Sequence, residues 1–187
     1  VFETDELKSL IEFVSRESGK KYEGSNMLPI KVIVEHGRTL TFAMSDGIYP
    51  SNDGRGYVLR RILRRALRFS RLLGLKEPFV YRIVDPIVAT MGEFYPEITE
   101  TVANVKNVIE AEERRFLETI ENGMDRLEEL MKSAKKSGSG LITGADAFVL
   151  YDTFGFPLEM TTEMAIEQGL KVDTGAFTTE MEKQRER

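Results

Sequence analysis

The sequence predicts a mainly α fold, namely an irregular helical bundle with one long helix and one arginine-faced amphipathic helix. Three observations support this prediction. Apolar residues recur every three or four positions along most of the 187 residues, which is the period of an α-helix. No proline interrupts the stretch from Glu97 to Lys136. Seven arginines and no acidic residue fall between Arg55 and Arg71, among apolar residues at helical spacing.

We expect four elements in the first part of the chain. An amphipathic helix runs from Asp5 to Ser18, and Gly19 stands where a left-handed glycine ends a helix. Residues 28–47 carry a helical stripe, although "IKVIV" also alternates as a strand does, and we predict a helix there. The loop "SDGIYPSNDGRG" is dense in turn-forming residues. The arginine segment follows it as a helix that ends at Gly74.

The second part begins with residues 78–96, which we predict to form a helix broken at Pro86 because proline lacks the backbone donor. The stretch Glu97–Lys136 follows as one helix of about 50 to 60 Å, at about 1.5 Å per residue. After the flexible segment "KSGSGLITG" we expect a helix capped by Asp146. Two more short helices follow, the first capped by Thr161 or Thr162 and the second by Asp173.

The polar side of the arginine segment forms one arc of about 140° when residues are projected at 100° each. It consists of Arg60, Arg61, Arg64, Arg65, Arg68 and Arg71. We expect this side to face outward and the opposite, apolar side to join the core. The segment contributes +7 to a chain whose net charge is −5, so the other residues sum to −12 and the basicity is local.

Such an arginine face has three interpretations. It can be a solvated face that pairs with the acidic remainder of the chain, a nucleic-acid interface, or a surface for an acidic protein or a membrane. Membrane-lying helices are typically rich in lysine and tryptophan, and this chain has no tryptophan. The planar guanidinium fork suits phosphate, and guanidinium groups on consecutive turns can hold several phosphates without reading sequence.

Asn52 and Asp152 are candidates for recognition of base edges. Asn52 lies in the loop just ahead of the arginine helix, and its amide can both donate and accept hydrogen bonds. The alternative for Asn52 is a plain turn residue, and for Asp152 a residue that ends a helix.

The composition excludes other kinds of site. Without cysteine there is no disulfide framework or thiolate metal site, and the single histidine, His36, cannot form a histidine cluster. We therefore predict no metal ligands and a structural His36. "SGSGLITG" lacks the lysine of a phosphate-binding loop, so we interpret it as a linker. Glu112 and Glu113 fit a charged surface pattern, and we predict no catalytic residue. No apolar run approaches the roughly 20 residues of a membrane span, so we expect no membrane partner.

Two segments, "SDGIYPSNDGRGYVLRRILRRALRFSRLLG" and "LYDTFGFPLEMTTEMA", resemble those that bracket the tRNA-recognition region of alanyl-tRNA synthetases. In addition, "ETDELKSLIEFVSRESGKKY" resembles the end of that family's catalytic core. The resemblance covers nearly the whole chain in the right order. It implies three parts: residues 1–24 as the end of the catalytic core, 25–136 as a helical tRNA-binding domain, and 137–187 as a second helical subdomain, truncated at its C-terminus.

The resemblance also implies a function. The family marks alanine tRNA by a G·U pair in the acceptor stem, and the Asn and Asp that recognise it match Asn52 and Asp152. Arginines would hold the phosphates of the stem, namely Arg55, Arg60, Arg61, Arg64, Arg65 and Arg68. The chain lacks the family's class II ATP-binding motifs, so we expect no cofactor in it and no aminoacylation by it alone. ATP and Mg²⁺ are expected in the intact enzyme and zinc in its editing domain. The expected partners are the tRNA(Ala) acceptor stem and the remaining domains, in the cytoplasm.

Overall fold

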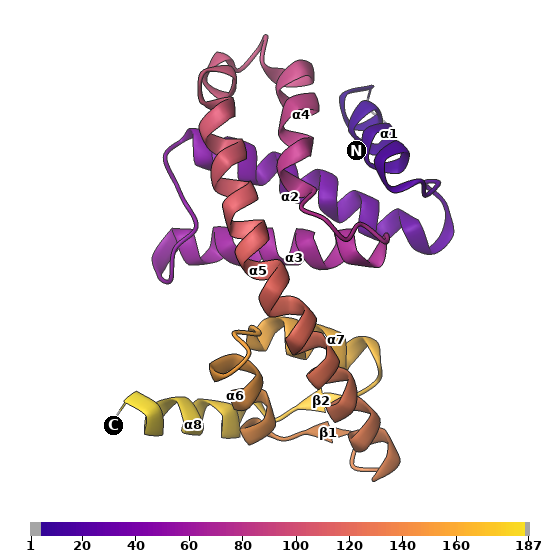
Figure 1. The fold of residues 1–187 in the computed structure, drawn as a ribbon, viewed down its shortest axis with the longest axis vertical. Coiled ribbons are helices and arrows are strands. Elements are labelled where there is room, and N and C mark those ends of the chain that lie inside the picture. Colours follow the sequence, from indigo (N-terminus) through magenta and orange to yellow (C-terminus); the bar gives the residue numbers. More distant parts are fainter. Residues whose placement is uncertain (1–4, 186–187) are drawn as a thin grey trace. The chain divides into compact units, whose positions relative to one another are not determined.

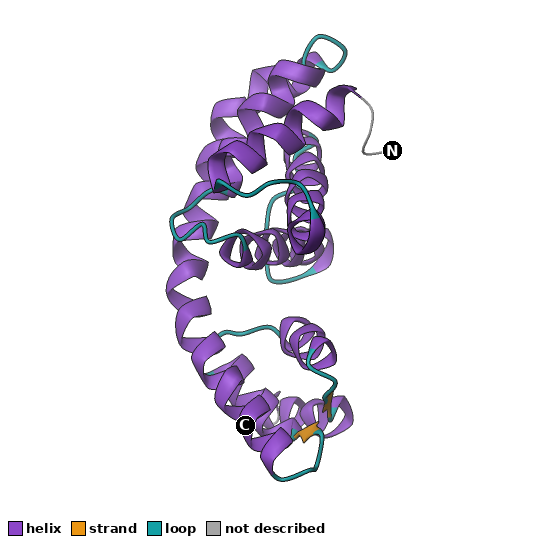
Figure 2. Cartoon of the chain, turned by 90° about the vertical axis from the view of Figure 1, so that its right-hand side faces the viewer, coloured by secondary structure: helices purple, strands orange, loops and turns teal. Residues whose placement is uncertain are grey.

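The computed structural model describes residues 5–185, and most of them lie in helices joined by short loops (Figures 1 and 2). The mainly α fold predicted from the periodicity is confirmed. Contacts divide the chain into two compact units, Val1–Phe116 and Leu117–Arg187. We describe each unit by itself.

The first unit is built from helices in chain order. They are α1 (Asp5–Ser18), the 3-10 turn η1 (Gly24–Asn26), α2 (Met27–Ser45), α3 (Gly54–Leu72), the 3-10 turn η2 (Val80–Ile83), α4 (Val84–Met91) and the first part of α5 (Pro96–Lys136). The helix α2 contacts α1, α3 and α4 (Figure 1). It therefore occupies the middle of this unit.

The central position of α2 explains why its sequence also resembled a strand. Ile30 and Val32 are both buried, although a helix places residues two positions apart on nearly opposite sides. Because α2 has neighbours on several sides, consecutive residues are apolar. Gly37 allows η2 to approach α2 closely, since a Cβ there would collide with the Ile83 side chain.

The predicted ends of the early helices are confirmed. Gly19 and Gly74 have left-handed backbones, with φ of 66° and 88°. After α3 the chain reverses, and the backbone N–H of Leu75 donates to the Ser70 carbonyl at 3.0 Å. Pro86 is the third residue of α4, where the N–H has no acceptor within the helix, so the break falls between η2 and α4.

The second unit comprises the remainder of α5 and five short elements. They are β1 (Leu141–Ile142), α6 (Gly144–Asp152), α7 (Leu158–Glu167), β2 (Lys171–Val172) and α8 (Thr174–Arg185). The two strands pair in parallel, with Leu141 opposite Lys171 (orange in Figure 2). This pairing was not predicted, because two-residue strands carry no recognisable period.

Two of the predicted helix caps in this unit are wrong. Thr143 caps α6 in place of Asp146: its hydroxyl accepts from the Asp146 backbone N–H at 3.1 Å and donates to that residue's carboxylate at 2.7 Å. The helix α7 begins at Leu158, so Thr161 and Thr162 lie inside it. The predicted cap of α8 is confirmed, since the Asp173 carboxylate accepts from the backbone N–H of Ala176 at 2.9 Å.

The long helix α5 has 41 residues, as the proline-free stretch predicted. The predicted subdomain boundary falls after residue 136, whereas the contacts divide the chain inside α5, after Phe116. The reason is that the later turns of α5 pack against the segment after α6. Gly123 lies directly on the buried ring of Phe156, and a Cβ at Gly123 would collide with that ring. Among residues 5–185, no helix is long and apolar enough to cross a membrane.

Candidate nucleic-acid interface

Asn52 is exposed in the loop between α2 and α3, as the sequence predicted. Two glycines shape this loop. Gly54 begins α3 with a left-handed backbone, φ of 55°. Gly56 is buried, and a Cβ there would collide with the Ser51 hydroxyl and the Tyr49 carbonyl oxygen. The backbone before Asn52 therefore lies directly on the first turn of α3, and glycine is required for this contact.

Side chains from other helices hold the same loop. The amide nitrogen of Asn104 on α5 donates to the Tyr49 hydroxyl at 2.8 Å. Within the loop, the Ser51 hydroxyl donates to the Asp53 carbonyl at 2.8 Å. Arg60 on α3 donates to the side-chain oxygen of Asn52 and, at 3.5 Å, to the Pro50 carbonyl. The loop is thus fixed at both ends and at Asn52 itself.

Arg60 is in turn held by Glu112 on α5. Its Nε donates to one carboxylate oxygen at 3.2 Å and its Nη2 to the other at 3.3 Å. The two side chains are only 16% and 17% exposed. One of the three interpretations of the arginine face was that it pairs with acidic residues of the same chain. Arg60 pairs in this way, with Glu112.

The expectation that the whole arginine face is outward is wrong. Arg68 is 2% exposed and lies against the ring of Phe69. Arg64 is half-buried, with its guanidinium 4.6 Å from the centre of the Phe116 ring on α5. The projection could not show the partial burial of Arg64, because it depends on Phe116 of α5. Arg61 is exposed, as predicted, and so is Arg55, which was not part of the projected face.

Arg65 is also half-buried, and its charge acts on His36 of α2. Burial first, and the nearby Arg65 charge second, lower the pKa of His36 from 6.5 to about 4. His36 is therefore neutral near neutral pH, and its Nε2 is buried without a hydrogen-bond partner. These features agree with the structural His36 predicted from the sequence.

Glu113 corrects the prediction that Glu112 and Glu113 form a surface pattern. Its side chain is fully buried and accepts the backbone N–H groups of Phe79, Val80 and Tyr81 at 3.0, 2.8 and 2.9 Å. These donors are at the start of η2, which has no side-chain cap of its own. Burial raises the pKa of Glu113 to about 7, against the lowering effect of the three donors. The burial of Glu113 could have been predicted from the sequence, since Glu113 falls on the apolar stripe of α5 between Ile109 and Phe116.

Asp152 lies in the second unit as the last residue of α6, and it is exposed. One of its carboxylate oxygens accepts from the side-chain amide of Gln184 on α8 at 2.5 Å. The chain then turns at Gly155, whose φ is 61°, and inserts Phe156 into the core. The position of Asp152 is therefore set by a helix end, a buried aromatic anchor and one side-chain donor.

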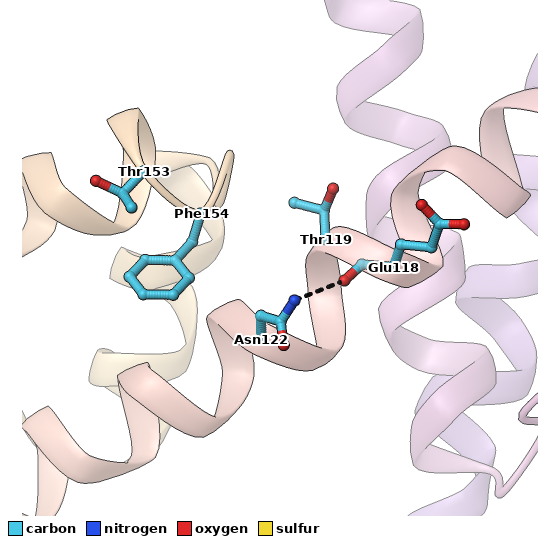
Figure 3. A pocket seen from close by; sticks show the side chains of 5 residues that line it. All are labelled: Glu118, Thr119, Asn122, Thr153 and Phe154. Atoms are coloured by element: carbon cyan, nitrogen blue, oxygen red, sulfur yellow. Dashed lines mark hydrogen bonds between the residues drawn. The ribbon is translucent and has the colours of Figure 1, made fainter.

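A shallow hollow lies beside this turn (Figure 3). Thr153 and Phe154 line it from the turn, and Glu118, Thr119 and Asn122 line it from α5. The Asn122 amide donates to the Glu118 carbonyl at 3.3 Å, the dashed line in Figure 3. These α5 residues were not predicted, because nothing in their spacing distinguishes them from other polar positions of the helix.

The predicted site residues therefore fall into two groups. The first unit brings Asn52 together with Arg60 and presents Arg55 and Arg61 nearby on α3. The second unit presents Asp152. No cluster of three or more His, Asp or Glu side chains within the described residues is arranged to hold a metal ion.

The chain belongs to the family described as tRNA synthetases class II (A), whose family model matches residues 1–187. Within that class the chain is similar to alanine–tRNA ligases. It is 50% identical over 188 residues to the alanine–tRNA ligase of Desulforamulus reducens, covering 100% of this chain and 21% of that protein. Identity to the alanine–tRNA ligase of Staphylococcus aureus is 49%, with the same coverage. The chain thus spans about a fifth of the length of the curated relatives it matches.

Proposed function

We propose that this chain is the segment of an alanine–tRNA ligase that holds the acceptor stem of tRNA(Ala). The intact enzyme would join alanine to this tRNA with ATP and Mg²⁺, in the cytoplasm, and its zinc would belong to the editing domain. The observation that carries the proposal is the similarity of the whole chain to alanine–tRNA ligases, combined with an exposed Asn52 directly before an arginine helix.

The chemistry of a G·U pair suits the two exposed polar residues. In a wobble pair the guanine amino group projects into the minor groove without its usual partner, and a carboxylate can accept it. The minor groove of A-form RNA is wide and shallow, so short side chains on loops can reach base edges there. We assign acceptance from the amino group to Asp152 and a second contact at the same base pair to Asn52.

The arginines of α3 contribute unequally to this proposal. Arg55 and Arg61 are exposed, and they are the residues we assign to phosphates of the stem. Arg64 and Arg65 are half-buried and contribute positive charge to the same surface. Arg68 is buried, so we assign no phosphate contact to it. Phosphate contacts of this kind give affinity without sequence preference, so specificity is assigned to Asn52 and Asp152.

The test is a titration of the 187-residue chain into hairpins that copy the alanine tRNA acceptor stem, at fixed moderate salt. One hairpin carries G·U at the marker pair and the other G·C. The expected preference for G·U is about 1 to 3 kcal/mol. It should be lost in Asp152→Ala and Asn52→Ala. The controls are Asp125→Ala and Asn107→Ala, two exposed residues of α5 that should leave the preference intact.

Two other outcomes would redirect the proposal. Equal binding of both stems, with affinity that falls steeply with salt, would mean that the chain grips RNA without reading the pair. No RNA binding in either case would leave a helical scaffold whose exposed arginines serve an acidic protein. In both outcomes Asn52 and Asp152 would be ordinary turn and helix-end residues.

A further inference from the structure

The contacts of Arg60 fix which atom of Asn52 can face RNA. Arginine has only donors, so the Asn52 atom beside its guanidinium must be the carbonyl oxygen. This assignment of the amide follows from the chemistry of the partner, although oxygen and nitrogen of an asparagine are otherwise hard to distinguish. With its oxygen engaged, Asn52 has its NH₂ group left to offer, and this group is a donor.

Arg60 itself is restrained from several sides. Nε and Nη2 bind Glu112, Nη1 binds Asn52, and Nη2 also approaches the Pro50 carbonyl. A bidentate pair with a carboxylate fixes the plane of a guanidinium group. With all three of its nitrogens directed at protein acceptors and 16% of its side chain exposed, Arg60 is poorly placed to hold a phosphate. This sets it apart from its neighbour Arg61, which is exposed.

We propose that Arg60, held by Glu112, is a positioning residue that orients the amide of Asn52 so that the loop offers RNA a donor, and that the matching RNA group is an acceptor. This inference rests on the proposed function and adds the polarity of the contact. Two acceptors at the marker pair have the required chemistry, the O2 carbonyl of uracil and the 2′-oxygen of its ribose. A lost donor–acceptor contact would weaken binding about five- to tenfold.

The experiment compares three hairpins: one with uridine at the marker pair, one with 2-thiouridine and one with 2′-deoxyuridine. The wild-type chain should bind one of the modified hairpins about five- to tenfold more weakly. A loss with 2-thiouridine identifies the base carbonyl, and a loss with 2′-deoxyuridine identifies the ribose. Asn52→Asp keeps the shape and the bond to Arg60 but has no N–H to donate, so it should no longer distinguish these hairpins.

Arg60→Lys is the decisive variant, because it keeps the charge but cannot bind Glu112 in two places while reaching Asn52. It should lose the distinction between the hairpins without changing the salt dependence of binding. Arg61→Lys is the matched control and should keep the distinction. If Arg60→Lys unfolds, Glu112→Gln serves instead, because it weakens the same restraint from α5. Circular dichroism establishes that each variant is folded.

The outcomes separate this inference from the proposed function. If Arg60→Lys and Glu112→Gln discriminate as the wild type does while Asn52→Ala does not, Arg60 has no positioning role. If neither modified hairpin binds more weakly although Asn52→Ala abolishes the G·U preference, the donor assignment is wrong. If the wild type shows no G·U preference at all, the proposed recognition of the G·U pair is itself wrong.

Discussion

Replacement of Glu113 by Gln should destabilise the protein and remove a pH dependence. The carboxylate accepts three backbone N–H groups, two on one oxygen and that of Tyr81 on the other. At pH 5 the folded Glu113 is a carboxylic acid, and both of its oxygens can still accept an N–H. Glutamine keeps one acceptor oxygen, but its NH₂ group would face the Tyr81 N–H, donor against donor. A backbone group left unsatisfied in this way costs about 1 to 3 kcal/mol. We therefore expect Glu113→Gln to lower the free energy of unfolding by about that amount at pH 5.

The pH dependence follows from the pKa of Glu113, which burial raises from 4.5 to about 7. Between these values the folded chain keeps a proton that the unfolded chain releases, so this residue's contribution to stability falls as the pH rises through that window. The full change is about 3 kcal/mol at about 1.4 kcal/mol per pKa unit. The destabilisation caused by Glu113→Gln should therefore shrink between pH 5 and pH 8.

The assay is urea unfolding followed by circular dichroism at both pH values, with amide exchange at Tyr81 as a local readout. The difference between wild type and variant isolates Glu113 from other titrating groups. Glu100→Gln, an exposed glutamate on the same helix, is the control and should have no effect at either pH. Equal stability of Glu113→Gln and wild type at pH 5, with unchanged exchange at Tyr81, would refute the reasoning.

Three further predictions concern other residues. The pKa of His36 is lowered to about 4, so the unfolded chain gains a proton first and stability should fall as the pH drops from 6.5 to 4. The loss is on the order of 1 kcal/mol for a partly exposed ring, and His36→Gln should abolish it in urea unfolding at stepped pH. Gly56→Ala should displace the loop of Asn52 and reduce the G·U preference about fivefold or more in hairpin titration, with the circular dichroism spectrum unchanged. Gly123→Ala forces a methyl group against Phe156 and should lower the free energy of unfolding by about 1 to 3 kcal/mol, whereas an unchanged thermal midpoint would contradict the packing described.

The long helix, the helical α2 and the glycine ends of α1 and α3 could be predicted from the sequence, because periodicity and left-handed glycines are local signals. The partial burial of Arg64 and the pairing of Arg60 could not, because they depend on Phe116 and Glu112 of α5, which is far away in the sequence. Thr143 and Asp146 illustrate a smaller error: both are capping residue types, and only the backbone decides which of them lies at the helix start.

The candidate site shows the same division between local and distant information. The loop position of Asn52 and the helix-end position of Asp152 follow from the residues around them and were among the predictions. Their donors, Arg60 and Gln184, come from positions 8 and 32 residues away. Glu113 could have been recognised, since a charged residue on an apolar stripe of a helix must find buried partners.

The central claim is that Asp152 accepts the amino group of guanine, and replacing this guanine by inosine tests it most directly. An inosine·uridine pair keeps the wobble arrangement but lacks the amino group. Binding of the G·U and inosine·uridine hairpins would be measured for wild type and for Asp152→Ala at one salt concentration. We predict that inosine weakens wild-type binding by about 1 to 3 kcal/mol and leaves Asp152→Ala unaffected. An equal loss in both proteins, or no loss in the wild type, would contradict the assignment.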